Sequence, residues 1–216
     1  MSVHTIVLAA GEGSRMKSKK AKSLQRIGGT SMLHKICTTA GKISPKITLV
    51  VGFDQDSVIK EATEYNREIS IAQQPKAIGT GDAVKCGLTQ VEKESKVLVL
   101  YGDVPLIQEG TLRKLIETSD DSLSILTTVL DNPYGYGRVA KDDSGNALSI
   151  VEEKDATDVE REINEIFTGV LCGPKSLLDE GLSIINNNNA AGEYYLTDLI
   201  SIINEKGYKI KTHEAS

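Results

Sequence analysis

The sequence predicts an α/β protein in which a mixed, mostly parallel sheet is flanked by helices and leads into a smaller lobe. Two patterns support this fold class. Short, unbroken apolar runs rich in Val, Ile and Leu recur through the first half of the chain, as in strands buried on both faces. Segments with apolar residues at helical spacing separate these runs, and such alternation is typical of parallel sheets.

The first half, about residues 1–130, alternates strand and helix. Strands are predicted at 5–8, 47–51, 68–72, 97–100 and 122–130, and helices around 33–40, 58–62, 83–91 and 112–116. Thr30 or Ser31 is expected to cap the first helix, and Gly41 to end it. Because ligands of such sheets bind beyond the carboxyl ends of the strands, functional residues are expected in the loops that follow them.

The second half, about residues 131–216, has a mixed pattern. A hairpin is predicted with strands at 136–140 and 147–151, because the residues between them have turn chemistry. A strand at 166–172, helices at 174–185 and 194–203, and a strand at 208–212 are expected to follow. We interpret the chain as a single domain, 1–216, with the substrate site in the cleft between its two halves.

Composition and charge argue against several classes of function. The 216 residues carry a formal net charge of −5, whereas proteins that bind nucleic acid present basic surfaces to phosphate. The longest apolar run, at 96–101, is far shorter than the roughly 20 residues of a membrane helix, and the N-terminus lacks a signal-peptide pattern. We therefore expect no nucleic-acid or membrane partner. The widely spaced Cys37, Cys86 and Cys172 are expected to be buried thiols in a reducing compartment, which indicates the cytoplasm.

A glycine-rich turn after the first predicted strand is the strongest local signal for a phosphate site. Gly11 and Gly13 would let backbone N–H groups approach phosphate oxygens, and Arg15 would add a forked cationic contact. The turn lacks the GxxxxGK[ST] pattern of a Walker A loop, and Met16 stands where a dinucleotide fingerprint needs its third glycine. Taken alone, such a turn is also compatible with a purely structural role.

Other loops carry candidate binding groups. Asp103 follows a predicted strand, where a carboxylate can hold Mg2+ against phosphate oxygens or can simply cap a loop. Gln74 begins a loop whose backbone and side chain could recognise the hydrogen-bonding edge of a flat base. Polar groups also gather at 135–138, 151–155 and 192–198, as in sites that bind sugars, although each could serve a turn or a cap.

Taken together and in order, these motifs resemble those of a known family. They are LAAGEGSRM, Lys22, QQPKAIGTG, LYGDVPLI, GYGRV, VEEKDAT and NNNNAAGEYYLTD. In combination they resemble the uridylyltransferase (pyrophosphorylase) domain of the bacterial N-acetylglucosamine-1-phosphate uridylyltransferases that are also glucosamine-1-phosphate acetyltransferases. LAAGxGxRM alone marks only the broad sugar nucleotidyltransferase superfamily, whereas YGDVPL, GYGR and GEYY followed by TD are more specific. The resemblance covers essentially the whole chain.

The resemblance implies a Rossmann-like, nucleotide-diphospho-sugar transferase fold with a smaller sugar-binding lobe. The family makes UDP-N-acetylglucosamine, a peptidoglycan precursor used in cell wall biogenesis, and pyrophosphate from UTP and N-acetylglucosamine 1-phosphate with Mg2+. By this resemblance Arg15, Lys22 and Asp103 would be catalytic, and Asp103 would bind the metal. The nucleotide would contact Leu8, Ala9, Ala10, Gly11, Gly13, Gln74, Gly79, Thr80, Tyr101 and Gly102, and the sugar would contact Gly137, Glu152, Phe167, Glu193, Tyr195 and Thr197.

Three departures from the family pattern affect this interpretation. Ala21 replaces the Pro that usually precedes Lys22, which would loosen the loop but leave the Lys. Phe167 replaces an Asn and cannot make its hydrogen bonds, which leaves the identity of the sugar open. Family members also carry a second Mg2+ ligand, an Asn, beyond the point where this sequence stops at Ser216, and then a left-handed β-helix acetyltransferase domain, absent here. A piece of a longer protein and a short homologue both fit these departures.

Alternative functions stay open at this point. Phe167 favours a different sugar phosphate, another phosphorylated acceptor or another nucleotide, whereas the missing second metal ligand favours binding of a nucleotide sugar without turnover. A Rossmann-type dehydrogenase is a weaker hypothesis because its fingerprint fails. Since family members trimerise largely through the β-helix domain, we expect this chain to be a monomer or a weak dimer whose partners are small-molecule substrates.

Overall fold

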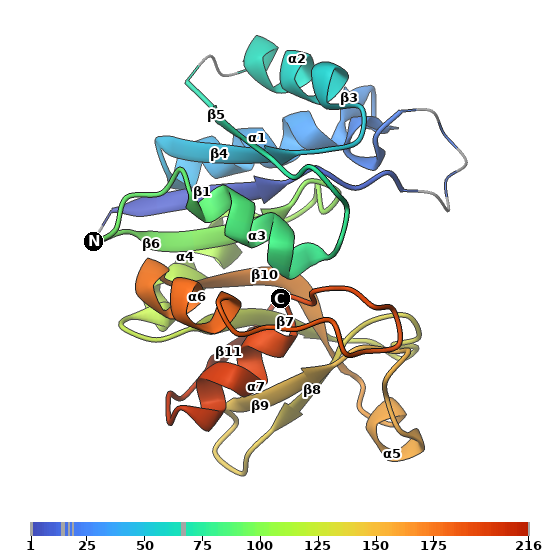
Figure 1. Ribbon diagram of the computed structural model, residues 1–216, viewed down its shortest axis with the longest axis vertical. Helices are drawn as coiled ribbons and strands as arrows, with labels where there is room; N and C mark the ends of the chain where they lie inside the picture. Colours follow the sequence, from blue (N-terminus) through green and yellow to red (C-terminus); the bar gives the residue numbers. More distant parts are fainter. Residues whose placement is uncertain (1, 14–15, 17, 19, 66–67, 216) are drawn as a thin grey trace.

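The computed structural model describes residues 2–13, 16, 18, 20–65 and 68–215, and a mixed β-sheet forms its centre (Figure 1). Within these residues the strand order is β11-β7-β10-β6-β1-β4-β5, and β8 and β9 extend the sheet from β10. The strands are β1 (Val3–Leu8), β4 (Lys46–Val51), β5 (Ser70–Gln73), β6 (Lys96–Tyr101), β7 (Ser124–Val129), β8 (Arg138–Lys141), β9 (Ala147–Val151), β10 (Glu165–Pro174) and β11 (Lys211–Glu214). Because β10 lies between β6 and β7, both halves of the chain share this sheet.

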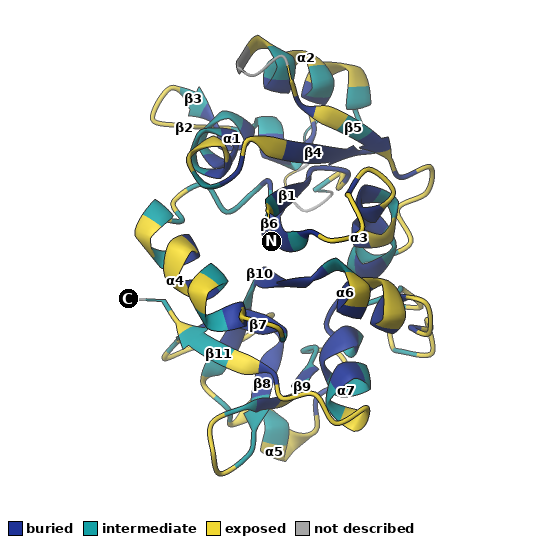
Figure 2. Cartoon of the chain, turned by 90° about the vertical axis from the view of Figure 1, so that its left-hand side faces the viewer, coloured by how far each residue is buried: buried dark blue, intermediate teal, exposed yellow. Residues whose placement is uncertain are grey.

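Helices cover both faces of the sheet (Figures 1 and 2). On one face lie α1 (Met32–Ile43), α2 (Gln55–Tyr65) and α4 (Glu109–Ser119), and on the other α3 (Thr80–Leu88), α6 (Lys175–Leu182) and α7 (Asp198–Glu205). Alternating side chains along each strand enter the two cores, so that Ile6 and Leu8 join the core under α3 whereas Val7 joins the core under α1. Among the described residues, no helix combines the length and apolar content needed to cross a membrane.

The register of the parallel strands brings four loops together at one edge of the sheet. Leu8 at the end of β1 pairs with Val50 of β4 and with Tyr101 of β6, and Val50 pairs with Ala72 of β5. The loops that follow these strands therefore begin at the same level. They carry most of the residues that the sequence analysis assigns to the nucleotide.

The predicted fold class is confirmed: a Rossmann-like, mostly parallel mixed sheet is flanked by helices. The antiparallel pairs involve β8, β9 and β10, so the second half supplies the mixed part of the sheet. Gly41 does not end the first helix as predicted, because α1 continues to Ile43 and the N–H of Ser44 still donates to Ala40 O at 2.9 Å.

Two boundaries near the C-terminus also differ from the prediction. Helix α7 begins at Asp198 rather than at Tyr194, because the backbone of Tyr194 bonds instead to the loop before α3, where its N–H donates to Ile78 O at 2.8 Å. Strand β11 is shifted towards the C-terminus because its pairing with β7 begins at Lys211, which lies opposite Ser124.

Some short elements have no prediction from the sequence: a 3-10 turn η2 (Lys22–Leu24), the hairpin strands β2 (Arg26–Ile27) and β3 (Thr30–Ser31), and α5 (Asp158–Arg161). The first three are too short for residue periodicity to be informative. Helix α5 does carry a signal, a capping box in which Thr157 Oγ1 accepts the N–H of Glu160 at 3.3 Å.

Ser31, one of the two predicted caps, is the N-cap of α1. Its Oγ accepts the N–H of His34 at 3.0 Å and donates to Glu61 Oε1 on α2 at 2.5 Å. We expect Ser31→Ala to lower the free energy of unfolding by about 1–2 kcal/mol, because a helix cap and a bond to a carboxylate are lost. Urea denaturation measures this change. Ser57→Ala, at an exposed position of α2, is the control, and equal effects of the two variants would contradict the assignment.

Candidate functional site

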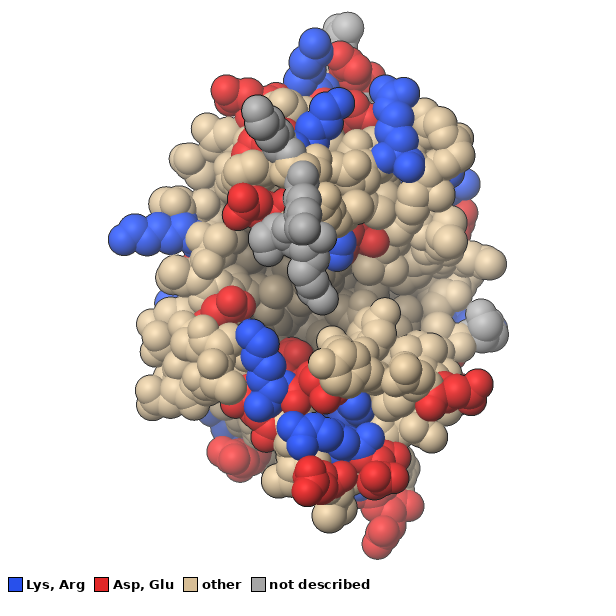
Figure 3. Space-filling model, turned by 90° about the vertical axis from the view of Figure 1, so that its right-hand side faces the viewer, with Lys and Arg blue, Asp and Glu red and all other residues tan. Residues whose placement is uncertain are grey.

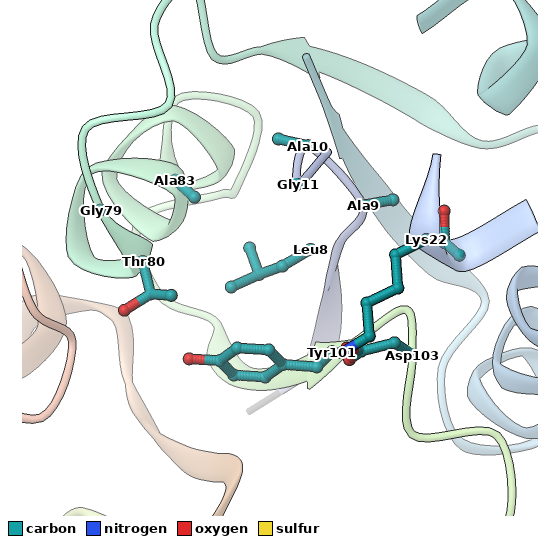
Figure 4. Close-up of a pocket in the computed structure, with 11 residues that line it drawn as sticks. Leu8, Ala9, Ala10, Gly11, Lys22, Gly79, Thr80, Ala83, Tyr101 and Asp103 are labelled. Atoms are coloured by element: carbon teal, nitrogen blue, oxygen red, sulfur yellow. The ribbon is translucent and has the colours of Figure 1, made fainter. Parts of the chain in front are cut away.

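A cavity of about 130 Å3 opens at this edge of the sheet, at the ends of β1 and β6 (Figure 4). Figure 3 views the molecule from the side of this edge and shows a hollow in the middle of the face. The cavity is lined by Leu8, Ala9, Ala10, Gly11, Lys22, Ser23, Gly79, Thr80, Ala83, Tyr101 and Asp103. All of these except Ser23 and Ala83 are predicted site residues. The structure therefore gathers residues from four of the sequence motifs, LAAGEGSRM, Lys22, QQPKAIGTG and LYGDVPLI, around one space.

The two lining residues that the sequence analysis misses have different signals. Ala83 lies on the apolar face of α3, so its pattern indicates packing and gives no sign of a site. Ser23 is buried beside Lys22, and its hydroxyl has no hydrogen-bond partner within the described part of the chain. A serine inside a basic stretch has no distinguishing sequence pattern.

The backbone of the first loop is held by the strands on either side of it. Leu8 O accepts the N–H of Gly102 at 2.8 Å, and the N–H of Ala9 donates to Val50 O at 2.9 Å. Gly13 has a φ of +67°, and a Cβ there would lie 2.7 Å from Lys22 Cβ, so a side chain at this position would collide with Lys22. Arg15, the other predicted phosphate ligand of this loop, lies outside the described residues.

Lys22 and Asp103 form an ion pair at the cavity, through Lys22 Nζ and Asp103 Oδ2 (Figure 4). Lys22 begins η2 and Asp103 follows β6, so the pair joins two segments that lie far apart in the sequence. The side chain of Lys22 is 42% exposed and that of Asp103 is 23% exposed, and both therefore remain accessible to a ligand. Gly102 precedes Asp103 at a crowded point, where a Cβ would lie 3.0 Å from Leu8 O.

The donor set beside Asp103 fits a magnesium ion. Among the described residues no three His, Cys, Asp or Glu side chains gather as a metal-binding group, and Asp103 is the ligand that the sequence analysis predicts. Mg2+ prefers hard oxygen ligands, keeps several waters and commonly binds through one or two carboxylates together with substrate phosphates. A single accessible carboxylate at the mouth of this cavity is compatible with these requirements.

Tyr101 forms the floor of the cavity, with its hydroxyl directed towards Thr80 (Figure 4). Burial raises the pKa of Tyr101 well above its ordinary value, so the phenol is neutral at physiological pH. Gly169, with a φ of +89°, packs against the ring, and a Cβ there would lie 2.8 Å from two ring carbons. Tyr101 is therefore held between the first half of the chain and β10 of the second.

Gln74 and Gly79 lie together at the next loop. Gln74 is buried, and its Nε2 donates to Gly79 O at 3.0 Å and to Asp82 Oδ2 at 2.9 Å. Gly79 has a φ of +132°, and a Cβ there would lie 2.3 Å from Tyr194 O. Gln74 does not line the 130 Å3 cavity but a neighbouring hollow of about 560 Å3, which also contacts Ala10. Asp82, which helps to orient the amide of Gln74, is not predicted from the sequence.

Three of the residues predicted to bind the sugar meet in the second half. Thr197 Oγ1 donates to Glu152 Oε1 at 2.9 Å. Gly137 lies beside this pair, and a Cβ there would lie 3.7 Å from the same Glu152 oxygen and 2.7 Å from Ile150. Burial raises the pKa of Glu152, even though the bond from Thr197 acts in the opposite direction.

Further negative charges surround Glu152. Asp155, Asp198 and Glu193 each add to the raised pKa of Glu152. Burial first, and then the charges of Asp155, Glu152 and Glu193, raise the pKa of Tyr195 to about 12. The predicted residues Glu193 and Tyr195 thus lie near Glu152, in a strongly acidic neighbourhood.

Phe167 differs from the other predicted sugar ligands. Its side chain is 7% exposed and belongs to the apolar core under α3, together with Val139 and Ile150. Its backbone still lies at the site, because the N–H of Phe167 donates to Gly137 O at 2.9 Å. A register shift in β10 follows, between Phe167 and Leu171. An aromatic side chain here joins the core, as its apolar character requires.

The raised pKa of Glu152 gives a pH-dependent prediction for stability. A carboxyl with a raised pKa in the folded state binds its proton more tightly there, so wild-type stability falls as pH rises from the ordinary Glu value of 4.5 through the raised value. Glu152→Gln keeps the acceptor for Thr197 and removes this loss. We therefore expect the stability of Glu152→Gln relative to wild type to increase between about pH 4 and about pH 7 in urea titrations. Glu64→Gln, an exposed change on α2, is the control for charge, and a Glu152→Gln difference that does not rise with pH would contradict the prediction.

Similarity to solved structures supports the fold. The chain superimposes on a UDP-glucose pyrophosphorylase complexed with UDP-glucose with a TM-score of 0.80 and 15% identity, covering 100% of this chain and 92% of that one. It superimposes on a putative glucose-1-phosphate thymidylyltransferase from Bacillus anthracis, in complex with sucrose, with a TM-score of 0.78 and 16% identity, covering 100% and 87% of the two chains.

Curated relatives are closer in sequence. The chain is 44% identical over 203 residues to the bifunctional protein GlmU of Francisella philomiragia subsp. philomiragia, which covers 94% of this chain and 44% of that protein. It is 42% identical over 213 residues to the bifunctional protein GlmU of Clostridioides difficile, covering 97% of this chain and 46% of that protein. The chain thus spans about half the length of the curated relatives it matches. The resemblance noted in the sequence is confirmed.

A family model matches most of the chain. The model describes a MobA-like NTP transferase domain and matches residues 5–156. This range includes the loops after β1, β5 and β6, which surround the cavity, together with Glu152. The chain therefore belongs to the family of MobA-like NTP transferase domains.

Proposed function

We propose that this chain transfers the uridylyl group of UTP to N-acetylglucosamine 1-phosphate, forming UDP-N-acetylglucosamine and pyrophosphate. One observation carries the proposal: Leu8, Ala9, Ala10, Gly11, Lys22 and Asp103, which the resemblance assigns to the nucleotide and the reaction, line one cavity. The match of GlmU relatives to almost the whole chain supports it. The proposal extends to the cytoplasm as the place of the reaction and to a product used in cell wall biogenesis. We also propose that the protein is a monomer or a weak dimer and that its partners are small-molecule substrates.

The chemistry that we propose is a direct, in-line displacement. A phosphate oxygen of the sugar 1-phosphate attacks the α-phosphorus of UTP, and the bond from that phosphorus to the bridging oxygen breaks as pyrophosphate leaves. The attacking oxygen is already an anion, so no general base is needed. The site must bring two anions together and neutralise their charge, which is the role we assign to Lys22 and Arg15.

Asp103 is the residue that would hold Mg2+ at this site. When bound, the ion would supply positive charge to the phosphate oxygens during the displacement. In the structure Asp103 is paired with Lys22, so the carboxylate keeps a cation beside the phosphate site without the metal. Tyr101, neutral and partly buried, offers no charge and would contact the ribose through its ring and hydroxyl.

On the sugar side, Glu152 and Thr197 would bind hydroxyl or amide groups beside Gly137. A second candidate acceptor, a sugar phosphate without the N-acetyl group, follows from Phe167. That side chain packs in the core and leaves only its backbone at the site, so it offers no hydrogen bond to an acetamido group.

Pyrophosphate release by the chain with UTP, Mg2+ and either N-acetylglucosamine 1-phosphate or glucose 1-phosphate tests both versions. Faster release with the acetylated sugar supports the proposal, and faster release with glucose 1-phosphate supports the second acceptor. If neither sugar gives release and calorimetry shows tight binding of a UDP-sugar, the proposal of transfer is refuted. Binding of a nucleotide sugar without turnover would then be the function.

A further inference from the structure

The short segment between β4 and α2, residues Gly52 to Asp54, contacts both ends of the stretch 10–21, which contains the glycine-rich turn and is called the phosphate loop below. At one end the N–H of Phe53 donates to Ala10 O at 3.1 Å. At the other end Asp54 Oδ2 accepts the N–H of Ala21 at 3.2 Å. Ala10 and Lys22, the neighbour of Ala21, both line the cavity. The segment thus holds the backbone at both ends of this stretch, at Ala10 and at Ala21.

The backbone N–H group of Ala21 is buried and needs a hydrogen-bond acceptor within the protein. The residue is fully buried in the core under α1 and precedes η2, the turn that begins with Lys22. A buried N–H group without a partner is unfavourable, and the carboxylate of Asp54 supplies an acceptor that reaches it from a separate loop. The bond therefore determines where the backbone of Ala21 lies, and hence where the side chain of Lys22 begins.

The backbone of Asp54 indicates that its side chain has a role of its own. Asp54 has a φ of +51°, and among the described residues only Asp120 is another non-glycine residue with a positive φ. Glycine adopts this conformation more readily than aspartate, so the conformation by itself favours glycine. The carbonyl of Asp54 accepts the N–H of Val58 at 3.1 Å at the start of α2, which needs no particular side chain. The carboxylate is the part that glycine could not replace.

We propose that Asp54 is a positioning residue for the transfer reaction: by holding the N–H of Ala21 it sets Lys22 beside Asp103 and the substrate phosphates. This inference rests on the proposed function, because the role of Lys22 does. Asp54 acts through the backbone and makes no contact with the reacting atoms. Its effect should therefore fall on the phosphate part of the site and leave the base part unchanged.

Asp54→Gly and Asp54→Asn test the proposal, since both residues tolerate a positive φ and only Asn keeps an acceptor. We expect Asp54→Gly to lower kcat about tenfold, the scale of one bond to a carboxylate, with little change in KM for UTP, and Asp54→Asn to stay within about twofold of wild type. Asp56→Ala removes an exposed carboxylate two residues along and is the control for charge. Equal kcat values for Asp54→Gly and wild type would overturn the proposal, and so would equal losses in the Gly and Asn variants.

Ala21→Pro supplies a second test, because proline has no N–H and the φ of −52° at Ala21 suits its ring. In that background Asp54→Gly should have no further effect on kcat, whereas an additional tenfold loss would show that Asp54 acts elsewhere.

A third measurement does not need turnover and separates this inference from the proposed function. In calorimetry, Asp54→Gly should weaken the binding of pyrophosphate about tenfold and leave the binding of uridine unchanged, and thermal unfolding reports any general loss of structure. Equal losses for both ligands would overturn the positioning role. If the wild-type chain binds pyrophosphate but releases none from UTP, the proposed function is refuted. The comparison of pyrophosphate binding between wild type and Asp54→Gly still tests the positioning role.

Discussion

Asp103→Asn is expected to lower kcat by about 10³-fold, with a smaller change in KM for UTP. The substitution keeps the size of the side chain but removes its negative charge. A hard divalent cation then loses its protein ligand, and Lys22 loses the partner that places it at the cavity. The Mg2+ concentration needed for half-maximal turnover should rise as well.

Asp143→Asn is a suitable control, because it removes a carboxylate at the exposed tip of the β8–β9 hairpin. It should leave kcat and the Mg2+ dependence unchanged. Near-normal turnover by Asp103→Asn would refute the metal assignment. A large loss of kcat with an unchanged Mg2+ dependence would instead assign Asp103 to holding Lys22 alone.

The part of the site that could be predicted is the part fixed by parallel strands. Leu8 and Tyr101 end neighbouring strands and pair directly, so residues that follow them in the sequence must meet in space. The same rule places Asp103 beside the first loop. These contacts need only the order of the strands, and short apolar runs followed by glycine or aspartate reveal them.

Contacts between segments far apart in the chain could not be predicted in this way. Thr197 reaches Glu152 within the second half, and the backbone of Tyr194 reaches Ile78 in the first half, although nothing in the local sequence links these positions. The second of these contacts also removes Tyr194 from the predicted last helix. The local sequence pattern indicates whether a residue tends to form a helix or a strand, and a hydrogen bond to a distant loop can override that tendency.

Two residues show how side-chain identity and position can point to different roles. Phe167 stands where the family has a sugar ligand, but its aromatic ring is drawn into the core and only its N–H remains at the site. Ala21, expected to loosen the phosphate loop, is fully buried and gains an N–H that Asp54 accepts. In both cases the physical chemistry of the residue that departs from the family motif decides whether its side chain packs or its backbone bonds.

Lys22→Met is expected to lower kcat by about 10²–10³-fold, because the site loses a positive charge that would stabilise the departing pyrophosphate. The aliphatic part of the side chain, which passes Gly13, is largely retained. Lys20→Met, at an exposed position in the same basic stretch, is the control and should leave kcat unchanged. Near-normal turnover by Lys22→Met would contradict the assignment of Lys22 to the substrate phosphates.

The same variant should bind a divalent cation more tightly, which is the opposite of its effect on turnover. In the structure Lys22 occupies Asp103 Oδ2, the group that the metal would need, so the ammonium group and the metal compete for one carboxylate. Binding of Mn2+ without nucleotide, followed by electron paramagnetic resonance, measures this competition. Unchanged or weaker Mn2+ binding would mean that the ion pair does not limit the metal. Because the two side chains share one interaction, the losses in Lys22→Met and Asp103→Asn should not add in the double variant, whose kcat should lie close to that of Asp103→Asn alone.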